Sequence, residues 1–114
     1  MLRAQNLSAN VRVMIKKYIE TQLERHADGA PHRFDELWDR VPDFSEGIRD
    51  SIAKQNSWIY LSPQTFDGWY LIQRGGQYEL YFQEKGQNCW GTQQFSNERD
   101  AMKALLKSAT DMGL

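Results

Sequence analysis

The pattern of apolar and polar positions changes period near the middle of the chain. In residues 9–26, apolar side chains recur at the i, i+4, i+7, i+8 spacing of one helical face. They are Val11, Ile15, Tyr18, Ile19 and Leu23. This spacing predicts an amphipathic helix with Ser8 as its N-cap, and Asp28, Gly29 and Pro31 are expected to end it.

Two shorter helices are expected next. Residues 33–40 predict one of them, and Pro42 ends it because proline cannot continue a helix. The side chains that share its apolar face are Phe34, Leu37, Trp38 and Val41. A third helix is expected from an N-cap at Ser45 to about Gln55.

The second half of the chain has the features of strands. Residues 58–61 predict a short strand, and residues 69–74 and 77–84 predict a hairpin around Gly75-Gly76. A two-residue loop pairs position 74 with position 77, which places Trp69 opposite Phe82 and Leu71 opposite Leu80 on one face. We expect these four side chains to be buried against a C-terminal helix.

A further strand and a final helix complete the predicted elements. Residues 89–95 predict a strand that Gly91 interrupts, and Ser96 or Asn97 caps a helix that runs to about Ala109. The expected fold is α+β, with N-terminal helices, an antiparallel β-meander of three to four strands and a C-terminal helix packed on the sheet. The expected organisation is a single domain of 114 residues, mainly helical over 1–56 and sheet plus helix over 57–114.

The composition indicates a soluble protein, and its charges are unevenly distributed along the chain. Aromatic residues make up 12% and the net charge is −1, and no apolar run approaches the roughly 20 residues of a membrane helix. The N-terminus lacks the apolar region of a signal peptide and the chain has one cysteine, so we expect a cytoplasmic protein. Residues 1–33 carry a net charge of +3, whereas residues 34–50 hold six acids and two bases, a net charge of −4. This acidic segment favours a basic partner.

Candidate catalytic chemistry is sparse. His26 and His32 have no cysteine or acid at the spacing of a metal site and are expected to be exposed. Cys89 has no nearby histidine and is expected to be a buried structural thiol. We therefore expect no enzymatic activity, no cofactor and no metal.

The segment from about Phe66 to Ala109 resembles a known module. It has a strand containing Trp69, the Gly75-Gly76 turn, an aromatic strand ending in Glu84-Lys85-Gly86, and then Phe95-Ser96-Asn97-Glu98 before a helix. This order resembles the closing module of small bacterial immunity proteins from polymorphic-toxin and contact-dependent growth-inhibition systems. Lys85 stands where the family usually has arginine.

The resemblance implies an antitoxin that binds the C-terminal domain of a cognate toxin. Many such toxins are nucleases with basic clefts, so the expected partner is a basic nuclease, with no direct binding to nucleic acid or membrane. Charge complementarity with such a partner would speed association. From charge and aromatic character, we expect the contact residues to be Asp35, Glu36, Trp38, Asp39, Asp43, Glu46, Asp50, Tyr70 and Tyr81.

Two alternatives remain at the level of sequence. The first is a small regulatory or adaptor domain, encoded by a phage or mobile element, that binds a protein other than a toxin. The second is a nucleic-acid binder that uses the basic face of residues 12–17 with Tyr70 and Tyr81 as stacking platforms. The near-neutral total charge disfavours the second, since binding to a phosphate backbone requires a basic excess.

Overall fold

The chain divides into two compact units. The computed structural model describes residues 2–55, 58–85 and 88–114, and for residues 2–13 and 88 it describes the backbone alone. One unit comprises Met1–Ser57 together with Met112–Leu114, and the other comprises Trp58–Asp111. The boundary falls where the hydrophobic pattern changes from helical to strand period. No helix among the described residues is long and apolar enough to cross a membrane.

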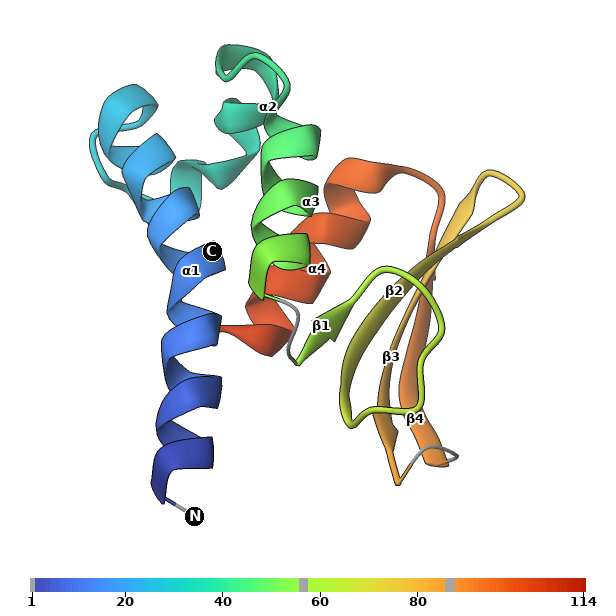
Figure 1. The fold of residues 1–114 in the computed structure, drawn as a ribbon. Coiled ribbons are helices and arrows are strands. Elements are labelled where there is room, and N and C mark those ends of the chain that lie inside the picture. The colour runs from blue at the N-terminus through green and yellow to red at the C-terminus, as the bar shows by residue number, and fades with distance from the viewer. Residues whose placement is uncertain (1, 56–57, 86–87) are drawn as a thin grey trace. The chain divides into compact units, whose positions relative to one another are not determined.

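The helical unit begins with a long helix, α1 (Leu2–His26), which is shown in Figure 1. The expected start near residue 9 is wrong, and Ser8 lies within the helix and is not its N-cap. The expected end is confirmed. Asp28 and Gly29 adopt left-handed φ angles of 53° and 73°, and the Gly29 N–H donates to the Leu23 carbonyl oxygen at 2.9 Å, which closes the helix end.

The expected helix over residues 33–40 consists of two short pieces. A 3-10 helix, η1 (Pro31–Glu36), leads into a single α-helical turn, α2 (Leu37–Arg40). Phe34 and Leu37 are buried, as their shared face predicts.

Helix α3 (Phe44–Gln55) begins two residues earlier than predicted. The Gly47 N–H donates to the carbonyl oxygen of Asp43 at 2.9 Å, so the first helical hydrogen bond starts at Asp43. Ser45 is therefore not the N-cap.

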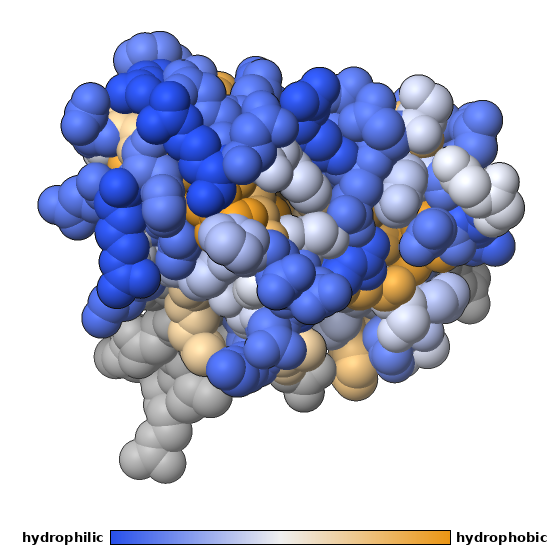
Figure 2. Space-filling view, turned by 90° about the horizontal axis from the view of Figure 1, so that it is seen from above, coloured by the Kyte–Doolittle hydropathy of each residue, from blue (hydrophilic) through white to orange (hydrophobic). Residues whose placement is uncertain are grey.

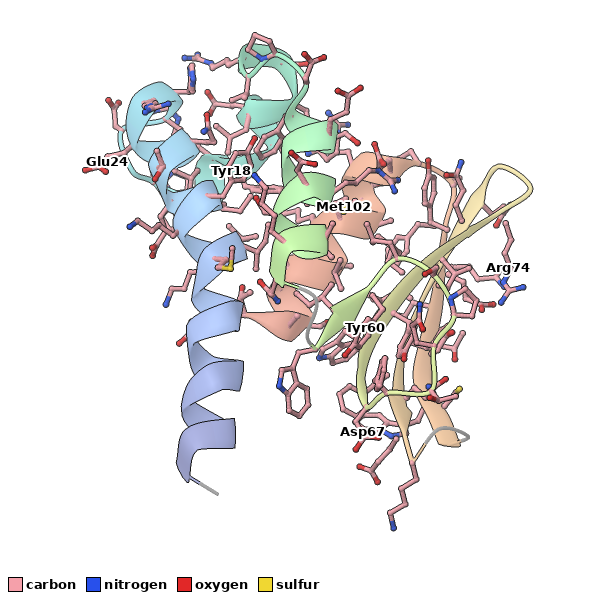
Figure 3. The ribbon with its side chains drawn as sticks, in the orientation of Figure 1. Tyr18, Glu24, Tyr60, Asp67, Arg74 and Met102 are labelled. Carbon is pink, nitrogen blue, oxygen red and sulfur yellow. The ribbon has the colours of Figure 1, made fainter. Side chains whose placement is uncertain are left out.

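Helices α1 and α3 pack closely against each other. Ile15, Ile19, Ile48 and Ile52 are almost fully buried. Tyr18 extends from α1 towards α3 (Figure 3), where its ring lies against the backbone of Gly47. This close approach requires a residue without a side chain on α3.

The second unit contains a four-stranded sheet in the order β1-β2-β3-β4. Its strands are β1 (Ile59–Tyr60), β2 (Gly68–Arg74), β3 (Gln77–Glu84) and β4 (Asn88–Phe95). The hairpin register is confirmed, with Trp69 opposite Phe82 and Leu71 opposite Leu80. Strands β2 to β4 form the expected antiparallel meander. The short β1 instead pairs with β2 in parallel, so the sheet is mixed.

Helix α4 (Glu98–Ala109) packs on this sheet. Asn97 is its N-cap and accepts a hydrogen bond from the Asp100 N–H at 2.9 Å. Leu71 and Leu80 are buried as expected, whereas Trp69 and Phe82 are only half-buried. The predicted face is thus correct in register and only partly correct in burial.

Candidate functional site

The predicted acidic contact residues all lie in the helical unit. Asp35 and Glu36 belong to η1 and Asp39 belongs to α2, while Glu46 and Asp50 lie on α3. Glu46 and Asp50 are four residues apart, so they share one face of α3, and Asp43 immediately precedes this helix. The buried residues of this helix, Phe44, Ile48, Ile52 and Gln55, occupy the opposite face. The helix therefore turns its carboxylates to solvent because its apolar face is buried.

Glu36 differs from the other acids because two arginines engage its carboxylate. Arg33 donates through Nε at 2.8 Å and through Nη2 at 2.9 Å, which is a bidentate pair. Arg40 lies 3.4 Å away and also donates to the carbonyl oxygen of His26 at the end of α1. The hydrogen bonds from Arg33 hold the pKa of Glu36 below its usual value. Glu36 thus ties η1 to α2, and its charge is largely compensated.

Four carboxylates form an exposed group, which we call the acidic surface. Its members are Asp39, Asp43, Glu46 and Asp50. Within the described part of the chain, none of them has a hydrogen-bond or ion-pair partner through its carboxylate. In Figure 2, which looks from above onto the ends of α2 and α3 seen in Figure 1, the visible surface is predominantly hydrophilic. These charges are available to a partner because nothing in the described chain neutralises them.

Trp38 is less available to a partner than the sequence suggests. Its side chain is half-buried and meets the Phe44 ring edge-on, with centroids 5.4 Å apart. The indole Nε1 is buried and has no hydrogen-bond partner among the described atoms. Trp38 therefore contributes mainly to packing between α2 and α3. It is half-buried, and the expectation of an exposed anchor is wrong.

Tyr70 and Tyr81, which were expected as partner contacts or stacking platforms, are buried. Tyr70 has no exposed surface and Tyr81 is 7% exposed. Their rings stack with centroids 5.2 Å apart, and they pack with Ile72 and Tyr60, which is labelled in Figure 3. As placed, neither ring can act as a stacking platform for a partner.

The segment between β1 and β2 is bonded to Tyr70 and to Gln83. The Tyr70 hydroxyl donates to the Phe66 carbonyl oxygen at 2.7 Å, and the Gln83 amide donates to the Gln64 carbonyl oxygen at 2.7 Å. Burial raises the pKa of Tyr70 to about 12. Sequence alternation placed both tyrosines on the second face of the hairpin, but it could not show that a loop bonds to that face.

An exposed tryptophan was missed by the sequence analysis. Trp90 on β4 is 52% exposed, and its ring lies 4.8 Å from that of Phe82 between centroids. Gly91 follows it with φ of 70°, and the pairing of β3 with β4 shifts register there. Because the position of this bulge was unknown, the partner of Trp90 could not be assigned. The neighbouring Cys89 is exposed, so its predicted burial is wrong.

The histidines lie at the end of α1 and in η1. His26 is half-buried and His32 is exposed. Among the residues that the structure describes, no three side chains of His, Cys, Asp or Glu are grouped so that they could hold a metal ion.

Comparisons with known proteins assign no family. No family model matches the chain, and no match is found among curated proteins or solved structures.

Proposed function

We propose that this protein is an immunity protein that binds and neutralises a cognate toxin domain, a basic nuclease, by occluding its substrate-binding surface. The observation that carries this proposal is the acidic surface, whose four carboxylates have no partner in the described chain. The resemblance of residues 66–109 to immunity proteins adds support from the other unit. In this proposal the protein acts in the cytoplasm and does so by binding, without catalysis.

The mechanism follows from charge complementarity. A nuclease must attract phosphates, so its cleft carries a positive potential that also attracts carboxylates. Glu46 and Asp50 lie along one exposed face of α3 and Asp43 immediately precedes the helix, so these carboxylates can take the place of backbone phosphates. Such complementarity mainly accelerates association. Rapid capture is what an antitoxin needs before the toxin reaches its substrate.

The proposal is tested by pairing the protein with the reading frame immediately upstream of its gene. The C-terminal domain of that product is expressed with and without this protein, and growth and nuclease activity are measured. We expect growth arrest without the protein and rescue with it, together with a stable complex of the two purified chains. If the upstream domain is harmless, or is harmful but neither bound nor neutralised, the proposal is wrong. Binding of a harmless partner would favour the adaptor alternative.

The acidic surface is tested separately by neutralisation. The variant Asp39→Asn, Asp43→Asn, Glu46→Gln, Asp50→Asn should keep its fold, because exposed carboxylates contribute little to stability. Its association rate with the toxin at low salt should fall about tenfold or more, and the rate should depend less on salt. The control is Glu84→Gln, an exposed carboxylate on β3, which gives the effect of one charge in the other unit. An unchanged association rate in the fourfold variant would eliminate the acidic surface as the site of steering.

A further inference from the structure

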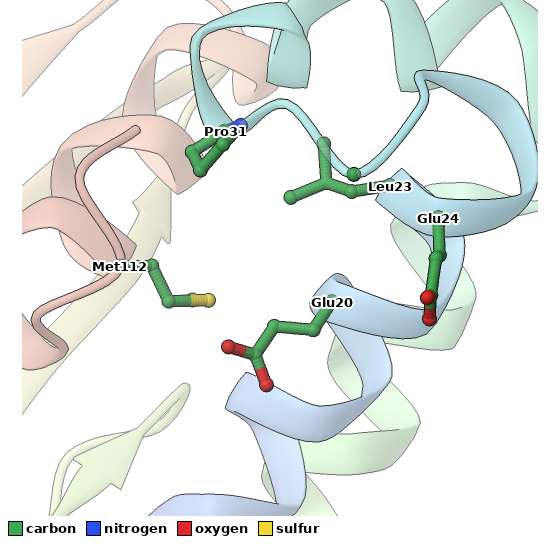
Figure 4. A pocket seen from close by; sticks show the side chains of 6 residues that line it. Glu20, Leu23, Glu24, Pro31 and Met112 are labelled. Atoms are coloured by element: carbon green, nitrogen blue, oxygen red, sulfur yellow. The ribbon is translucent and has the colours of Figure 1, made fainter.

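A second feature of the helical unit is a cavity beside the C-terminal half of α1. Its volume is about 320 Å³. The residues that line it are Glu20, Leu23, Glu24, Gly29, Pro31 and Met112. In Figure 4, the side chains of Glu20 and Met112 point towards one another across the cavity, with Leu23 and Pro31 beyond them. This volume is at the lower end of the range of roughly 300–1,000 Å³ for ligand pockets, so the cavity has room for one long side chain.

The lining of this cavity combines an apolar floor with two acids. Leu23 and Met112 are nearly fully buried, with 2% and 9% of their surface exposed. Glu20 and Glu24 are exposed, one helical turn apart, and neither carboxylate has a hydrogen-bond or ion-pair partner in the described chain. No lining residue carries a positive charge.

These properties restrict what can occupy the cavity. An anion would be repelled, and an apolar ligand would leave the carboxylates desolvated without a partner. A calcium ion needs six to eight oxygen ligands, and no third acidic, histidine or cysteine side chain joins this pair among the described residues. The matching shape is a cation on an aliphatic stem, because the stem can lie on the apolar floor while the charge meets the two glutamates.

We propose that this cavity binds an arginine side chain of the partner polypeptide, with its guanidinium between Glu20 and Glu24 and its methylene groups against Leu23 and Met112. A guanidinium suits this geometry better than an ammonium, because its planar fork of donors can bond two carboxylates at once. Methionine is flexible and polarizable, so it can adapt to the inserted stem. This inference rests on the proposed function, since it assigns the chemistry of one contact with the basic partner.

The test uses a small probe and does not need the toxin. Capped arginine (N-acetyl-arginine methylamide) is titrated into the full chain while NMR follows the Met112 methyl group and the backbone amides of residues 20–31. Capped citrulline is the matched control, because its side chain has nearly the same shape without the charge. Two double variants of the protein are compared. One carries Glu20→Gln with Glu24→Gln at the cavity, and the other, a matched control on α3, carries Glu46→Gln with Asp50→Asn. Circular dichroism checks that each folds.

We expect a saturable shift of the Met112 methyl signal with capped arginine and at least tenfold weaker binding of capped citrulline. The affinity for capped arginine should fall at least tenfold in the double variant Glu20→Gln, Glu24→Gln and should not fall in the α3 control. Equal binding of both probes, no saturation, or a loss only in the α3 variant would overturn the proposal. Agmatine binding tenfold more tightly than capped arginine would also overturn it, because the natural ligand would then be a free small molecule.

The outcomes also separate this proposal from the proposed function. If the toxin is neutralised but the probe does not bind, only the assignment of the cavity fails. If the probe binds as expected but no upstream toxin is neutralised, the cavity stands as an arginine site and the immunity function fails.

Discussion

Replacing Gly47 with alanine should reveal how tightly α1 and α3 are fitted together. In an open helix interior, glycine to alanine stabilises a protein by about 1 kcal/mol, because alanine has the higher helix propensity. At Gly47 a new Cβ would meet the end of the Tyr18 side chain, with the ring atom Cζ only 2.6 Å away. The Tyr18 ring must therefore move, although it also stacks on Phe44 with centroids 6.1 Å apart.

The magnitude follows from the balance of these two effects. Overpacking of this kind costs roughly 1–3 kcal/mol, which offsets or exceeds the gain in helix propensity. We therefore expect Gly47→Ala to change the free energy of unfolding by between about 0 and −2 kcal/mol. In a Tyr18→Leu background, which lacks the clashing atoms, the same substitution should stabilise the protein by up to about 1 kcal/mol. The difference between backgrounds, about 1–3 kcal/mol, is the coupling between the two residues.

Urea unfolding followed by the helical signal in circular dichroism measures all four members of this double-mutant cycle. The cycle provides its own control, because effects on the unfolded chain are common to both backgrounds. If Gly47→Ala stabilises the protein by the same amount with Tyr18 and with Leu at position 18, the close approach of α1 and α3 is wrong.

Two further predictions concern the second unit. Because burial raises the pKa of Tyr70 to about 12, the folded state keeps its proton after the unfolded chain has lost it near pH 10. Stability should therefore fall as pH rises from about 10 to 12. The ultraviolet titration should contain a late tyrosine component that Tyr70→Phe reduces, and burial of Tyr18 and Tyr81 raises their pKa values as well and leaves a remainder. An undiminished late component in Tyr70→Phe would contradict the assignment. Asn97→Ala should lower the free energy of unfolding by about 1 kcal/mol in a urea titration, because the cap to the Asp100 N–H is lost, while Asn97→Asp should retain most of it. Equal losses in the two Asn97 variants would argue against the cap.

The residues of the candidate sites could be found in the sequence only in part. The acids of residues 34–50 were found from charge alone, but only the structure showed that Arg33 and Arg40 engage Glu36, because ion pairing depends on how η1 turns into α2. The cavity beside α1 was missed for a similar reason. The acids at positions 20 and 24 are visible in the sequence. The apolar floor of the cavity, however, includes Met112, which lies far away along the chain.

Elements whose cause is local could be predicted from the amino-acid sequence. The Gly75-Gly76 turn set the hairpin register, because a two-residue loop fixes which residues of the two strands lie opposite each other. The register in turn fixes which side chains share a face of the sheet. The C-terminal end of α1 and the cap of α4 likewise followed from Asp28, Gly29 and Asn97, whose backbone and side-chain preferences act within a few residues.

Tertiary structure alone decided the features that depend on distant partners. The parallel pairing of β1 arises where Gly68 approaches the Trp58 backbone so closely that a Cβ would lie 2.7 Å from its carbonyl oxygen. Tyr70 is buried where the segment between β1 and β2 bonds to its hydroxyl, and Tyr81 is buried where its ring stacks on that of Tyr70. Cys89 is exposed on β4, a strand at the edge of the sheet. Alternation along a strand assigns a side chain to a face, but what covers that face depends on residues elsewhere in the chain.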